Sequence, residues 1–121
     1  GDVEMSIEGD ITTALKSVCP RVFPDFADVG TQRPYITYQL IGGPSVYALD
    51  STPIDKRLPK LQVNAWANTR LQANQLIREV ESALTNSPLF SATPDGEPTA
   101  GFDEANEVRG AMQDFNMIVN R

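Results

Sequence analysis

The chain has 121 residues, a common size for a single domain, and 40% of them are hydrophobic while 21% are charged. It contains no histidine and a single cysteine, which excludes Ser-His-Asp triads, Cys-His pairs, imidazole metal sites and an intrachain disulfide. The formal net charge of −6 argues against non-specific binding of nucleic acid, because binding to the phosphate backbone depends on clustered Lys and Arg. No apolar run is long enough to suggest a membrane span.

The first predicted element is a helix over residues 6–18. Its apolar side chains recur at helical spacing and form one stripe: Ile7, Ile11, Ala14, Leu15 and Val18. We expect Ser6 to cap its start and Pro20 to prevent its continuation. Residues 1–4 precede Met5, so we expect them to be a remnant of cloning and residues 5–121 to form one domain.

Two strands are predicted next, at residues 35–41 and 60–67, after a short edge segment at residues 21–26. The first strand has Ile36, Tyr38 and Leu40 on one face, and the second has Leu61, Val63, Ala65 and Ala67 on one face. The stretch between them, residues 45–59, is longer than a tight hairpin needs, so we expect a long arm.

A second helix follows, and the spacing of Thr69 and Gln72 predicts a capping box at its start. Its apolar stripe contains Ala73, Leu76, Ile77, Val80, Ala83 and Leu84. The polar connector at residues 91–101 is rich in Pro and Gly and is interpreted as an ordered hairpin loop or a mobile tip. The chain then closes in a strand over residues 112–119, with Gln113, Phe115, Met117 and Val119 on its better-buried face.

This order of elements predicts a single α+β domain with the order α-β-β-β-α-β-β. Its sheet is mixed but mainly antiparallel, and two helices pack on one face. No element of the chain is then expected to pack on the opposite face of the sheet. We expect a neighbouring subunit to contact this exposed face.

Four groups of residues contain side chains that could form chemical sites. Asp103, Glu104 and Glu107 lack the turn glycine of a calcium loop, and solvated charges are the favoured interpretation. Asp25 and Asp28 would need burial for acid–base work, which nothing in the sequence indicates. Gly42-Gly43-Pro44-Ser45 lacks the lysine and helix of a phosphate loop and is interpreted as a turn, and Cys19 as a buried apolar residue. We therefore predict no catalytic, cofactor-binding or metal-binding residues and no cofactor.

Two further features bear on contacts with other molecules. The densest basic cluster is Lys56-Arg57 with Lys60, which is either a solvated loop tip or a contact to another subunit or to DNA. Trp66 lies on the face of its strand opposite Leu61 and Val63, where it packs in the core or sits at an interface.

Several short motifs resemble one family of phage proteins. They are Met5–Ile11, Arg21–Pro24, Pro34–Tyr38 and the run Gln62–Thr69 before an Ala-containing helix, and the similarity resumes in the final strand. These segments are similar to the tail-completion, or head-tail joining, proteins of long-tailed bacteriophages and prophages, which are related to tail terminators. The final strand departs from more aromatic members of the family, since it reads Asp-Phe-Asn-Met at residues 114–117.

The resemblance implies a non-catalytic structural protein of the virion tail or neck, assembled in the cytoplasm of the bacterial host. It implies a ring of six subunits at the head-proximal end of the tail. The implied partners are the tail-tube and head-connector proteins, with neither membrane nor sequence-specific nucleic acid. Ring contacts join two different surfaces of each subunit. We expect these on the arm (Tyr47, Asp50, Lys56 and Arg57) and on the connector (Asp103 and Glu104), with Trp66 as a further interface residue.

Two other classes of function remain open from the sequence. The first is a regulatory module that binds a small molecule or a peptide on the open sheet face. The second is a carboxylate-based hydrolase that uses Asp25 or Asp28.

Overall fold

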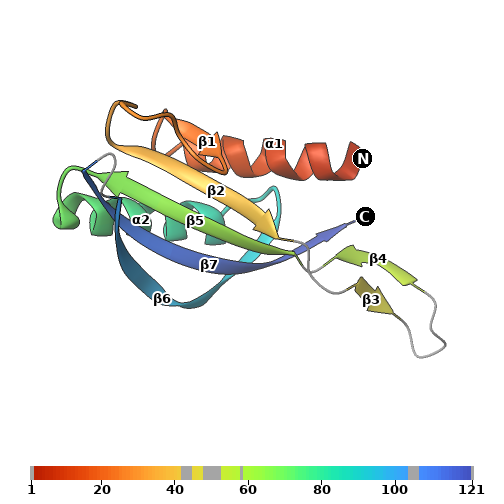
Figure 1. Cartoon of the computed structure of the whole chain (residues 1–121). Coiled ribbons are helices and arrows are strands. Elements are labelled where there is room, and N and C mark those ends of the chain that lie inside the picture. The colour runs from red at the N-terminus through yellow and green to blue at the C-terminus, as the bar shows by residue number, and fades with distance from the viewer. Residues whose placement is uncertain (1, 42–44, 48–52, 58, 104–106, 121) are drawn as a thin grey trace.

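A computed structural model describes residues 2–41, 45–47, 53–57, 59–103 and 107–120 of the chain. It contains two helices, α1 (Asp2–Lys16) and α2 (Arg70–Thr85). The strands are β1 (Val22–Pro24), β2 (Tyr35–Ile41), β3 (Ser45–Tyr47), β4 (Pro53–Arg57), β5 (Lys60–Ala67), β6 (Ser91–Asp103) and β7 (Val108–Asn120). The predicted α+β class and order of elements are confirmed, and β3 and β4 are additional short strands within the predicted arm (Figure 1).

The main part of the sheet has the strand order β1-β2-β5-β7-β6. β1 runs parallel to β2, whereas the pairs β2–β5, β5–β7 and β7–β6 are antiparallel, which makes the sheet mixed but mainly antiparallel as predicted. β7 is the central element, because β5 pairs along one of its edges and β6 along the other. The shorter hairpin of β3 and β4 joins this sheet where β4 pairs with the end of β7.

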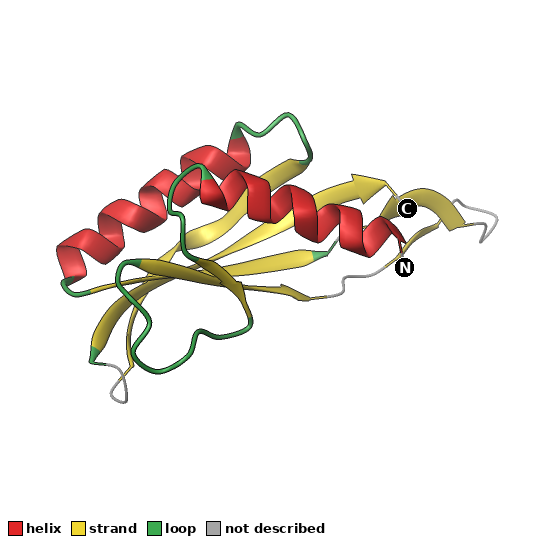
Figure 2. Ribbon diagram, turned by 90° about the horizontal axis from the view of Figure 1, so that it is seen from above, coloured by secondary structure: helices red, strands yellow, loops and turns green. Residues whose placement is uncertain are grey.

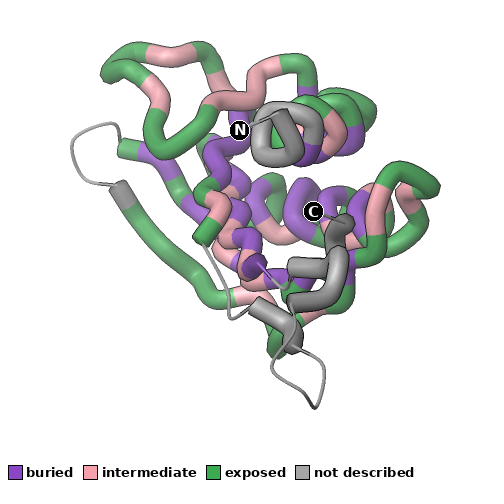
Figure 3. Tube along the Cα trace, turned by 90° about the vertical axis from the view of Figure 1, so that its right-hand side faces the viewer, coloured by how far each residue is buried: buried purple, intermediate pink, exposed green. Residues whose placement is uncertain are grey.

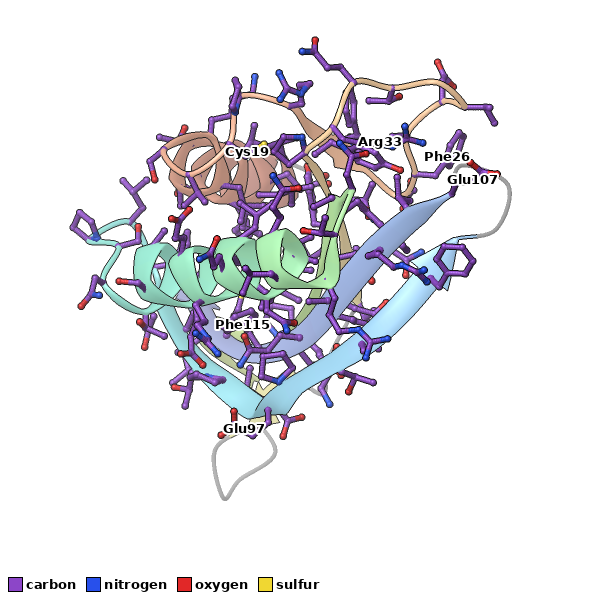
Figure 4. All side chains as sticks on the ribbon, turned by 90° about the vertical axis from the view of Figure 1, so that its left-hand side faces the viewer. Cys19, Phe26, Arg33, Glu97, Glu107 and Phe115 are labelled. Atoms are coloured by element: carbon purple, nitrogen blue, oxygen red, sulfur yellow. The ribbon has the colours of Figure 1, made fainter. Side chains whose placement is uncertain are left out.

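Both helices lie on the same face of the sheet, as Figure 2 shows from above. The alternating burial of β5 explains this arrangement, because Leu61, Val63, Ala65 and Ala67 are buried while the residues between them are half-buried. The buried residues of β7, Ala111, Phe115 and Met117, face the same side. In Figure 3 the buried segments of the trace lie where the helices and the sheet face each other. Figure 4 shows Phe115 beneath α2.

The start of α2 is set by its N-cap. The Thr69 hydroxyl accepts a hydrogen bond of 3.2 Å from the backbone N–H of Gln72, which satisfies one of the free donors of the first turn. From there Ala73, Leu76, Ile77, Val80 and Leu84 are buried against the sheet. The predicted cap and stripe are both confirmed.

The predicted start of the first helix is wrong. α1 begins at Asp2, so Ser6 lies inside the helix, and residues 2–4 belong to it. No proline or glycine occurs between Asp2 and Ile7 to prevent an upstream extension, and a capping residue type does not by itself end a helix. Ile7, Ile11, Ala14 and Leu15 nevertheless form the predicted buried stripe.

The connector predicted as a loop or tip is also different. Residues 91–103 form β6, which is paired with β7 along its length. Its composition is typical of a loop, but β7 supplies the hydrogen-bonding partner that an isolated segment lacks. Prolines such as Pro94 and Pro98 are tolerated because β6 lies at the edge of the sheet.

Candidate assembly surfaces

The first surface is the arm, which we define as β3 and β4. Its strands pair at Ser45 with Arg57 and at Tyr47 with Pro53, with a register irregularity between them. β4 joins β7 at Lys56 with Asn120 and Arg57 with Val119, and the hairpin projects beyond the end of the main sheet (Figure 1). The structure therefore places three of the predicted interface residues, Tyr47, Lys56 and Arg57, on one projecting hairpin. Asp50 lies outside the described residues.

The second surface is the outer edge of β6. Within the described residues β6 pairs with β7 and forms one border of the sheet, so its other edge is available to a neighbour. The register shifts between Asp95 and Thr99, where β6 has more residues than the opposing stretch of β7. Gly96 in this bulge has φ of +87°, a backbone conformation that favours glycine. The predicted interface residue Asp103 is the last residue of β6, and Glu104 lies outside the described residues.

The third surface is the sheet face opposite the helices. Trp66 lies on it, half-buried, and its indole N–H donates a hydrogen bond of 3.0 Å to the Thr37 hydroxyl. Its ring stacks on Tyr35 with 6.3 Å between ring centroids. Tyr35 and Thr37 are both buried, so β2 is covered on both faces at this end. Trp66 thus packs in a small cluster on the open face while part of its surface stays accessible.

An ion pair crosses the same face from β5 to β6. The Lys60 ammonium lies 2.9 Å from a carboxylate oxygen of Asp95. This hydrogen bond, the Coulombic attraction of Asp95 and a smaller contribution from Asp114 raise the pKa of Lys60 above its ordinary value of 10.5, against a small opposing effect of desolvation. Lys60, which the sequence grouped with the basic arm residues, is therefore engaged with its own sheet.

A cavity of about 420 Å³ lies between α2 and the bulge of β6. Arg78 and Glu81 line it from the helix, Glu97 from the bulge and Gln113 from β7. Figure 4 shows Glu97 at the outer end of the sheet, away from Phe115. The alternation over residues 112–119 predicts Gln113 on the buried face and indicates no further role for it. A glutamine among apolar residues at alternating positions was the available signal.

The loop between β1 and β2 exposes apolar side chains that the sequence analysis did not single out. Phe26 is 73% exposed and Val29 is 77% exposed. Asp25, immediately before Phe26, has φ of +64°, which is uncommon for a residue other than glycine. Exposed apolar side chains gathered on one loop favour contact with another protein.

The residues considered as chemical sites lie apart from these surfaces. Asp25 and Asp28 are exposed in the β1–β2 loop, without the burial that acid–base work would need. Cys19 is 2% exposed, and its thiol lies 3.5 Å from the Pro34 carbonyl oxygen, to which it donates, so the predicted buried role is confirmed. Among the described residues, no three Asp, Glu or Cys side chains are grouped as a metal site. No helix in the described part of the chain is long and apolar enough to cross a membrane.

A small α+β domain with a projecting arm, an available sheet edge and an open sheet face has the features of an assembly subunit. The model of the tail completion protein gp17 family matches residues 9–116, and the chain belongs to this family. The predicted family is thereby confirmed. The chain is a structural virion protein with a role in tail completion.

The same fold occurs in a solved structure. A chain from the virion of a native gene transfer agent (GTA) particle has a TM-score of 0.67 and 12% sequence identity, and the match covers 98% of each chain. A protein from Akkermansia muciniphila gives a TM-score of 0.46 at 9% identity, covering 92% of this chain and 46% of that one. A comparison with curated proteins gave no match.

Proposed function

We propose that copies of this chain form a closed ring at the head-proximal end of the tail, where the ring caps the tail tube and binds the head connector. Family membership supports the role in tail completion. The ring and its two binding partners extend that role to a specific geometry. The proposed ring acts by holding the tail tube and the head connector together. Its subunits provide the two docking surfaces and catalyse no reaction.

The observation that carries the proposal is the placement of the arm and the β6 edge on different parts of the subunit. A contact between two different surfaces is heterologous, and such contacts close into rings when the rotation between subunits permits. Tyr47, Lys56 and Arg57 of the arm are therefore proposed to meet the β6 side of the next subunit. Asp103 at the end of β6 is proposed to take part in the same contact. Asp50 and Glu104, which lie outside the described residues, are proposed as further interface residues.

The open face provides the remaining contact area. Trp66 presents the accessible part of its ring there, and tryptophan is enriched among residues that dominate binding energy. The bulge and the prolines of β6 limit indiscriminate strand pairing at the edge, which favours one specific neighbour over open-ended aggregation. The net charge of −6 disfavours adhesion to DNA that passes through the ring.

Mass measurement tests the ring. Native mass spectrometry and light scattering of the purified chain, alone and after incubation with tail-tube protein, should give a single closed oligomer in at least one condition. Negative-stain images should show rings at the end of tail tubes. A chain that stays monomeric in both conditions and leaves tube ends bare would contradict the proposal.

The same experiment separates the ring from a regulatory module on the open sheet face. A regulatory module would remain monomeric, ignore tail-tube protein and bind a small molecule or peptide. We also propose that the chain has no enzymatic activity, which the family's structural role supports. Hydrolysis that disappears in both Asp25→Asn and Asp28→Asn variants would contradict this second statement.

A further inference from the structure

The most exposed apolar side chains of the described residues gather at one end of the sheet. Phe26, Val29 and Leu71 are 73%, 77% and 68% exposed. The β1–β2 loop leads into the start of β2, and Leu71 follows the end of β5 that pairs with this start, so all three lie at the end opposite the arm (Figure 1). The exposed apolar residues toward the arm end are only 45–47% exposed: Ile41, Leu89 and Ile118.

Hydrogen bonds hold the tip of the β1–β2 loop, which we define as residues 25–31. At its start, the backbone N–H of Asp25 donates to the Tyr38 carbonyl oxygen of β2 at 2.8 Å. At its end, the backbone N–H of Thr31 donates to the Asp28 carbonyl oxygen at 3.1 Å, and the Thr31 hydroxyl donates to the same oxygen. The loop tip therefore presents its apolar side chains in a preformed shape, which lowers the entropic cost of binding a partner.

The loop tip is separate from the surfaces that are proposed to join neighbouring subunits. β1 and β2 lie at one border of the main sheet, β6 lies at the other border, and the arm lies at the opposite end of β2. Figure 4 looks onto the end that carries the loop and shows Phe26 there. A contact between the arm and the β6 side of a neighbour involves neither border nor end that carries the loop tip. Its exposed apolar side chains are thus available to a further protein.

The charge of the loop tip indicates what kind of partner fits it. Asp25 and Asp28 are both exposed and lie on either side of Phe26 in the sequence. Residues 22–32 contain no lysine or arginine. A complementary site therefore combines an apolar recess, which takes the aromatic ring, with basic residues around its rim.

Cavities on a second copy of this chain suit the loop tip poorly. The cavity of about 220 Å³ between Cys19 and α2 has Glu79 in its lining. The cavity of about 420 Å³ beside the β6 bulge has Glu81 and Glu97 against Arg78. The whole chain carries a formal net charge of −6, so a second copy would bring like charges toward the acidic tip. These charges favour a different protein as the partner.

We infer that the tip of the β1–β2 loop docks Phe26 and Val29 into an apolar recess with a basic rim at the end of the tail tube. This inference deepens the proposed function and rests on it. The family has a role in completing the tail, and a protein that completes a tail must bind the tail before the head joins it. The tail-tube protein is therefore assigned to this surface, in preference to the head connector.

Photo-cross-linking tests the contact directly. Phe26 is replaced by the photoreactive residue p-benzoylphenylalanine, and the full chain is irradiated with purified tail tubes and head-connector protein. We expect mass spectrometry to identify the tail-tube protein as the cross-linked partner. The same residue placed at Glu8, an exposed position on α1, is the control and should give little product. Cross-links from position 26 to a second copy, or to the connector alone, would overturn the inference.

Binding to purified tail tubes, measured by co-sedimentation, provides a second readout. Phe26→Ser should weaken binding about tenfold or more, and Val29→Ser should weaken it by a smaller factor. Leu89→Ser, at the arm end, should change it little. Asp28→Lys should weaken binding and reduce its dependence on salt, because the attraction to a basic rim is lost. Thermal unfolding of each variant checks that the fold is intact.

The outcomes distinguish the inference from the proposed function. Rings of Phe26→Ser that bind tube ends as tightly as the unmodified chain would overturn the loop contact and leave the ring standing. Cross-links from position 26 to tail-tube protein, in a chain that forms no oligomer with or without tubes, would support the loop contact and overturn the ring.

Discussion

At the scale of single residues, the open face is shaped by close contact between an aromatic ring and a glycine. Gly110 on β7 lies opposite Trp66 on β5 and also opposite Gly101 on β6. A Cβ atom added at Gly110 would lie 2.7 Å and 2.9 Å from two ring carbons of Trp66. The same addition at Gly101 would meet nothing within 4 Å. The ring of Trp66 therefore occupies the space that a side chain at position 110 would need.

This difference gives a prediction with an internal control. Gly110→Ala should lower the free energy of unfolding by about 1–3 kcal/mol, because the Trp66 ring must shift or the strands must separate. Gly101→Ala should change it by less than about 0.5 kcal/mol, as is usual for an unobstructed surface position. Urea unfolding followed by tryptophan fluorescence measures both. Equal effects in the two variants would show that the ring does not rest against Gly110.

At the scale of elements, the Lys60–Asp95 pair ties β5 to β6 across the intervening strand β7. The two side chains are 41% and 45% exposed, so solvent and salt screen their attraction strongly. The pair therefore contributes little to global stability, and its effect depends on the charge of the lysine. A raised pKa in the folded state means that the folded protein holds the Lys60 proton more tightly than the unfolded chain.

The sign of the pH dependence follows from that raised pKa. The contribution of the Lys60–Asp95 pair to the free energy of unfolding is fully present below the ordinary lysine pKa of 10.5. It is lost as pH rises through the higher pKa that Lys60 has in the folded state. Asp95→Asn should therefore flatten the fall in stability above pH 10.5 relative to the unmodified chain. Its effect at pH 7 should shrink in high salt. Thermal unfolding across this pH range checks the trend, and identical slopes in the two proteins would contradict it.

At the scale of the whole molecule, the hydrophobic core and the arm are separate. The core cluster draws on α1, α2 and the main strands, with Phe115 and Leu61 fully buried at its centre. The arm meets this body where β4 pairs with the end of β7, and β2 and β5 already pair directly up to Ile41 with Lys60. The domain should consequently fold without the arm.

Removing the arm tests this separation. Replacement of residues 45–57 by an Asn-Gly turn should leave a cooperatively folded monomer, because the core residues remain and Asn-Gly suits a tight hairpin. The same variant should fail to form rings under conditions in which the unmodified chain does. Circular dichroism with thermal unfolding reports the fold, and native mass spectrometry reports assembly. A ring of normal size from this variant would remove the arm from the interface.

Local spacing is enough to predict the elements whose side chains repeat with a clear period. The stripe of α2 with its Thr69 cap, the alternation in β5 and the better-buried face of β7 all follow from local spacing, because one face of each element meets the core. The short motifs also pointed to the correct family. These features depend only on neighbours along the chain.

Other features depend on residues that are distant along the chain and become visible only in the folded protein. Residues 91–103 look like a loop and become β6 because β7 offers a continuous hydrogen-bonding edge. Gln113 looks like one more position on a buried face, and only the bulge at Gly96 and the approach of Glu81 provide the acceptors for its amide N–H groups. The contacts of Trp66 with Thr37 and with the backbone at Gly110 also appear only in the folded sheet. The environment of each of these residues depends on a contact between strands, and the spacing of apolar residues along the chain does not predict such contacts.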